Sequence, residues 1–131
     1  MKGLVIAEPW IGLILSGGKT WELRSRRTQH RGPFALIRKG SGTVVGVADL
    51  SDCLPPLTAS TMADTEACHG VPPCVQPSAV GSGWVVPWLL KSVQAIRPVP
   101  HLHPPGAVTW VLLDQLTSGH VFEQVRMCAD T

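Results

Sequence analysis

A change of hydrophobic period within residues 8–26, EPWIGLILSGGKTWELRSR, is the feature that most constrains the fold. Residues 9–16 place apolar side chains at helical spacing, and a proline suits the start of a helix because its missing N–H is not needed there. The glycine pair at 17–18 then ends the helix. Beyond it the apolar residues recur at about every second position, as in a strand. The sequence therefore predicts a helix that turns sharply into a strand.

Charged side chains gather where the predicted helix passes into the strand, a part of the chain that we call the hinge. Packing alone does not require charged residues there. They are Lys19, Glu22, Arg24 and Arg26. A partly desolvated lysine beside a glutamate would have a lowered pKa and could serve as a base or as an electrostatic clamp. A purely structural ion-pair cluster that fixes the turn is the alternative. We take the hinge as the candidate functional site.

The positive charge of the chain is concentrated in residues 19–39, although the net charge is only +2. In this segment Glu22 is the only acid, and the basic residues are Lys19, Arg24, Arg26, Arg27, Arg31, Arg38 and Lys39. Such a patch favours a phosphate-bearing or nucleic-acid ligand, with a solvated surface loop as the plain alternative. Arg26, Arg27 and Arg31 are the candidate phosphate contacts, because arginine suits bidentate phosphate recognition.

Length and composition point to one domain of 131 residues, with 44% hydrophobic residues giving a real core. No apolar run is long enough to cross a bilayer, and the N-terminus does not resemble a signal peptide, so we expect a cytoplasmic protein. We expect no cofactor and no metal, because the histidines and cysteines match no structural zinc spacing. His69 is interpreted as a surface histidine. The oligomeric state stays open.

The remaining segments predict a mainly β protein of the α+β class with two or so short helices, arranged as a small, partly open barrel. A helix is expected at 58–68, with Thr61 and Asp64 in capping-box spacing. Residues 70–83 are expected to form a long loop, since Pro72, Pro73 and Pro77 disfavour regular structure, and such loops often cover binding sites. Strands are expected at 3–7, 20–26, 33–39, 43–50, 83–90 with a continuation over 92–98, 107–113 and 121–127. Segments 33–39 and 43–50 should form a hairpin, and Pro87 should place its strand at an edge or a bulge.

The hinge resembles the signature of the ASCH domain family, the activating signal cointegrator homology domains of the PUA-like superfamily. Its Q-P-W-like start is similar to Glu8-Pro9-Trp10, and S-G-x-K-x-x-E-x-R is similar to residues 16–24. Later segments of the family resemble Arg31-Gly32 to Ile37, Gly46 to Cys53, Pro98 to Pro100 and Trp110 to Leu112. The resemblance covers residues 3–114 of a single domain 1–131, and leaves 115–131 as a C-terminal extension.

The resemblance implies a PUA-like β-barrel whose hinge lines a cleft for RNA, a nucleotide or a modified nucleobase. The candidate ligand-binding residues are Trp10, Lys19, Thr20, Glu22, Arg24, Arg26, Arg27 and Arg31. Trp10 could stack on a base, although its helical spacing suits core packing as well. We favour binding of RNA, or of a modified nucleoside or nucleotide, as the function.

Two enzymatic alternatives also follow from the resemblance. Some relatives are amidohydrolases that act on acylated cytidine with a lysine, a threonine three residues later and a distal glutamate. Lys19 matches the lysine, Glu22 stands where the threonine would be, and Glu66 is the candidate for the distal glutamate. The candidate catalytic residues are therefore Lys19, Glu22 and Glu66. A ribonuclease that uses the same lysine is the second alternative.

Overall fold

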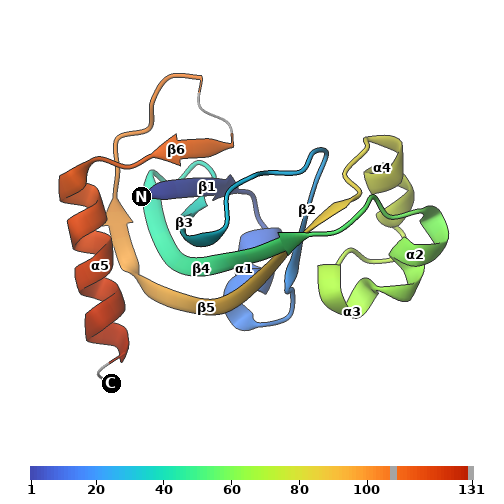
Figure 1. Ribbon diagram of the computed structural model, residues 1–131, viewed down its shortest axis with the longest axis horizontal. Helices are drawn as coiled ribbons and strands as arrows, with labels where there is room; N and C mark the ends of the chain where they lie inside the picture. Colours follow the sequence, from blue (N-terminus) through green and yellow to red (C-terminus); the bar gives the residue numbers. More distant parts are fainter. Residues whose placement is uncertain (107–108, 130–131) are drawn as a thin grey trace.

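The computed structural model describes residues 1–106 and 109–129. Its six strands form one sheet in the order β2-β5-β4-β3-β1-β6, which curls into a half-barrel (Figure 1). This arrangement confirms the predicted α+β class and the partly open barrel. The elements are β1 (Lys2–Ile6), α1 (Trp10–Ser16), β2 (Trp21–Arg24), β3 (Gly32–Arg38), β4 (Thr43–Cys53), α2 (Ala59–Asp64), α3 (Glu66–His69), α4 (Gln76–Gly81), β5 (Val86–Pro100), β6 (Trp110–Leu112) and α5 (Gln115–Ala129).

Strand β3 lies at the centre of the molecule and is buried on both faces. Phe34 and Leu36 join one core cluster with Ile11 and Ile14 of α1. The residues between and after them on β3 point the other way, into a second cluster that includes Val121 of α5. A strand covered on both faces needs a nearly continuous apolar run rather than alternation, which explains the sequence of this segment. Its predicted hairpin with β4 is confirmed by the antiparallel pairing of the two strands.

Helix α1 ends where the sequence predicts, at the glycine pair. Gly17 adopts a left-handed conformation with a φ of 87°, and its N–H donates to the carbonyl of Ile14. Glycine reaches this conformation without the steric cost that a Cβ would add. The turn is then fixed by Lys19, whose backbone N–H donates to the carbonyl of Leu13 at 3.2 Å. The chain therefore leaves α1 in one defined direction and enters β2.

The structure contains more helix than the sequence indicates. The described residues hold five helices instead of two, and the expected loop at 70–83 contains α4. Pro77 lies in the first turn of α4, where no helical hydrogen bond from its nitrogen is required. The expectation that the prolines exclude regular structure from 70–83 was therefore wrong.

The predicted helix at 58–68 is split into α2 and α3 at Thr65. The capping box of α2 joins Thr58 and Thr61, not Thr61 and Asp64. The Thr61 backbone N–H donates to the Thr58 hydroxyl oxygen at 3.2 Å, and the Thr61 hydroxyl oxygen accepts from the Thr58 N–H at 2.7 Å. The first helix, α2, therefore begins directly after Thr58, at the start of the predicted segment, but it ends at Asp64 instead of continuing to residue 68.

The C-terminal segment forms a helix, so the strand expected at 121–127 was wrong. Asp114 caps α5, because its carboxylate accepts from the backbone N–H of Thr117 at 2.7 Å. Val121 is completely buried against the sheet. The apparent alternation in this segment also fits a helix with one apolar side, and packing on the sheet decides between the two.

Two further strand predictions, at 83–98 and 107–113, have mixed outcomes. β5 covers the two predicted segments from Val86 onward, and it lies between β2 and β4 rather than at an edge. The nearest irregularity in its pairing with β4 lies between Leu50 and Asp52. Pro87 pairs with Leu23 of β2, and its carbonyl accepts from the N–H of Leu54 at 2.9 Å. The strand predicted at 107–113 appears as β6, while residues 107–108 lie outside the described residues. Within the part of the chain that the structure describes, no helix is long and apolar enough to cross a membrane.

We expect Gly46→Ala to destabilise the fold, because the β4 backbone passes close to α1 and β5 at this residue. An added Cβ would lie 2.7 Å from Cδ2 of Leu15 and 2.9 Å from the carbonyl oxygen of Gln94. The free energy of unfolding measured in urea should fall by about 1–3 kcal/mol. Gly119→Ala in α5 is the matched control: its Cβ meets nothing within 4 Å, and we expect a gain of about 0.5–1 kcal/mol. Equal effects of the two substitutions would contradict the close approach at Gly46.

Candidate functional site

A cleft of about 720 Å³ opens beside the hinge. Its wall is formed by β2 on one side, by β1 and the start of β6 on another, and by α4 with the chain that follows it. The size lies in the range of small-molecule sites, about 300–1,000 Å³. The lining residues are Val5, Ala7, Trp10, Lys19, Glu22, Leu23, Arg24, Ser25, Arg26, Arg27, Thr28, Gln29, Lys39, Val71, Val75, Ser78, Ala79, Ser82, Trp84, Trp88, Thr109 and Trp110.

Lys19 is the most deeply placed charge of the cleft, with only 2% of its surface exposed. Its ammonium donates to the carbonyl oxygen of His69 at 2.6 Å and lies 3.8 Å from Oε1 of Glu22. It also lies 5.3 Å from the ring centroid of Trp10, within cation–π range. Burial lowers the pKa of Lys19 from 10.5 to about 8, although the negative charge of Glu22 opposes the shift.

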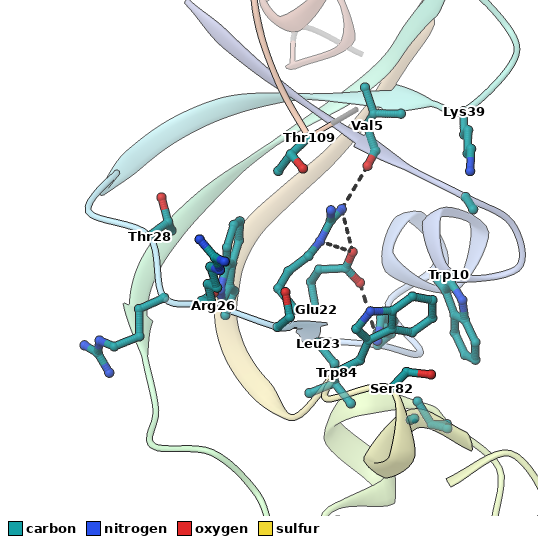
Figure 2. Close-up of a pocket in the computed structure, with 18 of the residues that line it drawn as sticks. Val5, Trp10, Glu22, Leu23, Arg26, Thr28, Lys39, Ser82, Trp84 and Thr109 are labelled. Atoms are coloured by element: carbon teal, nitrogen blue, oxygen red, sulfur yellow. Dashed lines mark hydrogen bonds and ion pairs between the residues drawn. The ribbon is translucent and has the colours of Figure 1, made fainter. Parts of the chain in front are cut away.

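Glu22 is also buried, at 5% exposed, and lies between two cations, Lys19 and Arg24. Its Oε2 accepts from Nε of Arg24 at 3.0 Å and forms an ion pair with Nη2 of Arg24 at 3.0 Å. Nη2 of Arg24 also donates to the carbonyl oxygen of Val5 at 2.8 Å. Figure 2 shows this chain of contacts running from Val5 to the Glu22 carboxylate. Arg24 therefore connects β2, at one edge of the sheet, with β1 across the open side of the half-barrel.

The carbonyl that receives the Lys19 ammonium is fixed by the side chain of the same residue, His69. Nδ1 of His69 accepts from the N–H of Val71 at 2.9 Å, so Nε2 carries the proton and donates to the carbonyl of Met62 at 2.7 Å. His69 is fully buried, so its interpretation as a surface histidine was wrong. Its side chain fixes the backbone at the end of α3, so that the His69 carbonyl meets the Lys19 ammonium.

Three cationic side chains line the outer part of the cleft: Arg26, Arg27 and Lys39. Arg27 is anchored through a hydrogen bond to the carbonyl of Cys53 at 3.0 Å. Arg31 does not line the cleft. Its guanidinium donates to the carbonyls of Thr28 and His30 and lies 3.6 Å from the Asp52 carboxylate, so it fixes the local turn.

The structure brings together most of the residues singled out in the sequence. Trp10, Lys19, Glu22, Arg24, Arg26 and Arg27 all line the cleft. Thr20 and Glu66 are exposed and, like Arg31, lie outside the lining residues. Thr20 instead fixes the backbone, where its N–H donates to the carbonyl of Cys68 at 2.8 Å. The cleft therefore has Glu22 as the one carboxylate among the described residues that line it.

Sequence reasoning did not assign the aromatic wall to the site. Trp84, Trp88 and Trp110 line the cleft together with Trp10. They come from segments that are far from the hinge in sequence, and although Trp110 lies in a segment that resembles the family pattern, only the fold reveals that all three line the cleft. Lys39 was recognised as part of the basic segment but not as a cleft residue.

No metal centre is evident in the site. Within residues 1–106 and 109–129, no group of three or more His, Cys, Asp or Glu side chains could hold a metal ion.

Comparison with known proteins places the fold. A model of the ASCH domain family matches residues 4–100. The structure is similar to that of ASCH from Zymomonas mobilis, with a TM-score of 0.72 and 16% sequence identity over 93% of both chains. Two single-residue variants of that protein are similar to the same extent, each at 16% identity over 93% of this chain. Their TM-scores are 0.70 and 0.71, and the matches cover 94% and 96% of the variant chains, respectively. No curated protein matches the chain.

The lowered pKa of Lys19 predicts a distinct pH dependence of stability. The folded protein releases this proton near pH 8, whereas the unfolded chain holds it to about pH 10.5. Between these values the unfolded chain binds more protons, so the folded state gains stability as the pH rises. Relative to Lys19→Met, the unfolding free energy of the wild type should rise by roughly 2 kcal/mol between pH 8 and pH 10.

Urea unfolding of both proteins at a series of pH values measures this difference. The other lysines are common to the two proteins, so their titration cancels. A difference that stays constant from pH 7 to pH 10 would show that Lys19 has an ordinary pKa.

Proposed function

Because the chain belongs to the ASCH domain family, we propose that its cleft binds RNA through an unpaired nucleotide. The observation that carries the proposal is the combination found in one cleft. A buried lysine–glutamate pair and several indoles lie beside exposed arginine side chains. Recognition of single-stranded RNA commonly requires these parts: aromatic faces for the base, polar groups for its edge and cations for the phosphates.

Lys19 and Glu22 offer hydrogen-bonding capacity that the protein does not use up. The ammonium has three donors, and His69 is its hydrogen-bond acceptor among the described residues. Oε1 of Glu22 faces this ammonium at 3.8 Å, beyond hydrogen-bond range, while Oε2 is occupied by Arg24. The pair therefore presents a donor next to an acceptor. The Watson–Crick edges of the bases carry adjacent acceptors and donors, so an unpaired base would complement the pair.

The exposed arginines of the cleft, Arg26 and Arg27, lie where the sugar–phosphate backbone of such a nucleotide would extend from its base. In Figure 2, Trp10 and Trp84 lie on one side of Glu22, and Arg26 and Thr28 lie on the other. A nucleotide whose base reaches the aromatic side would extend its phosphates toward Arg26 and Arg27. Arginine binds phosphate through paired N–H groups, which adds affinity without reading sequence.

We expect Arg26→Ala to weaken binding of single-stranded RNA and to reduce its dependence on salt. Each phosphate contact that is lost should lower the slope of log K against log[salt] by about 0.7. Fluorescence anisotropy with a labelled single-stranded oligoribonucleotide at several KCl concentrations measures both quantities.

Arg97→Ala is the charge-matched control, because Arg97 is exposed on β5 and does not line the cleft. Arg31→Ala removes a second arginine outside the lining residues. Equal slopes for the Arg26, Arg31 and Arg97 variants would place the RNA elsewhere on the surface.

A second candidate function, cleavage of the bound RNA, is favoured by the pKa of Lys19, near 8. General acid–base catalysis is most effective when the pKa of the group lies near the working pH. A neutral Lys19 amine could accept the ribose 2′-hydroxyl proton while that oxygen attacks the adjacent phosphorus. The P–O5′ bond then breaks, and the 5′-oxygen leaves as a hydroxyl after taking a proton from water. The amidohydrolase alternative has less support, because Glu66 lies outside the residues that line the cleft.

If the cleft cleaves RNA, Lys19→Ala should abolish the degradation seen with the wild type, because the group that exchanges the proton is gone. Gel analysis of a labelled oligoribonucleotide over time measures the rate. Lys91→Ala, which removes an exposed lysine of β5 outside the cleft, should leave the rate unchanged. Unaltered cleavage by Lys19→Ala would exclude this chemistry.

A further inference from the structure

Trp84 differs from the other tryptophans of the cleft, because 55% of the residue is exposed, whereas Trp10, Trp88 and Trp110 are buried or half-buried. The residue lies between α4 and β5, and its position is fixed by the backbone. Its N–H donates to the carbonyl of Ala79 at 2.9 Å, and the carbonyl of Val85 accepts from the N–H of Leu57 at 2.8 Å. The indole is therefore held on a well-defined turn while much of its surface faces water.

The other three indoles of the cleft already have partners for their rings. Trp10 receives the Lys19 ammonium. Trp88 and Trp110 stack on each other with centroids 5.9 Å apart, and the Arg24 guanidinium lies 5.7 Å from the Trp88 ring. Among the described residues, Trp84 alone of these four has neither an aromatic ring nor a cation against its face.

We infer that Trp84 is the stacking platform for the base, and that the ligand is an unpaired nucleobase rather than a duplex. This inference rests on the proposed function. It assigns stacking to Trp84 instead of Trp10, whose ring is engaged by Lys19. A base stacked on Trp84 would direct its hydrogen-bonding edge toward Glu22, which lines the same cleft. A base within a duplex has its faces covered and its edge paired, so it meets neither requirement.

A pair of oligonucleotides separates stacking from phosphate binding. One is a short single-stranded RNA, and the other has the same length and phosphates but lacks all its bases. Because base–aromatic stacking is worth about 1–3 kcal/mol per base, Trp84→Ala should weaken binding of the first about 5- to 160-fold. Binding of the abasic chain should not change, and Trp84→Phe should retain most of the wild-type affinity.

Phe122→Ala is the matched control, because Phe122 is 57% exposed on α5, away from the cleft. It should bind both oligonucleotides like the wild type. A blunt duplex of equal length should bind the wild type more weakly than the single strand.

Three outcomes decide the matter. Wild-type affinity of Trp84→Ala for the base-containing strand, with Arg26→Ala still impaired, would overturn the stacking role and leave the proposed function standing. Equal wild-type affinity for single strand and duplex would overturn the selection of an unpaired base. Failure of the wild type to bind any oligonucleotide would overturn the proposed function and the stacking role together.

Discussion

The contact between Arg24 and the carbonyl oxygen of Val5 holds together both the fold and the cleft. Among residues 1–106 and 109–129, the edge strands β2 and β6 of the half-barrel each lack a strand partner on one side, so the sheet does not close between them. Arg24 connects β2 to β1, the neighbour of β6, at 2.8 Å while also binding Glu22. A buried carboxylate requires such a partner, because an uncompensated buried charge is strongly destabilising. The charges of the cleft and the closure of the barrel therefore belong to one network.

The charged residues of this network are close together in sequence, which is why the sequence singled them out as one site. Lys19, Glu22 and Arg24 lie within six residues, and the helix stop at Gly17 with the alternation that follows is enough to direct them to one place. The same locality made the β3–β4 hairpin predictable. Short-range patterns could also indicate the mainly β class, since each strand has its own composition and turn residues.

What the sequence could not predict depends on contacts between distant segments. The carbonyl of His69 meets Lys19 from 50 residues away, and Trp84 enters the cleft from the chain after α4. Residues 121–127 have a pattern compatible with either period, and the burial of Val121 against the sheet selects the helix. Pro77 was taken to exclude a helix, although a proline in the first turn is compatible with one. In each case tertiary packing decides between local alternatives.

Among the described residues, the buried Lys19 ammonium and Glu22 carboxylate lack hydrogen bonds that a bound ligand could supply. The lowered pKa of Lys19 means that the folded protein disfavours the charged ammonium despite Glu22, Trp10 and the carbonyl of His69. A structural ion pair would be expected to close to hydrogen-bond distance, yet Lys19 and Oε1 of Glu22 remain 3.8 Å apart. A ligand that accepts from the ammonium and donates to the carboxylate would supply the missing hydrogen bonds of both groups. Such a ligand would stabilise the folded protein by an amount that grows with the logarithm of its concentration above its dissociation constant, and the cost of the buried pair in the free protein would be offset in the complex.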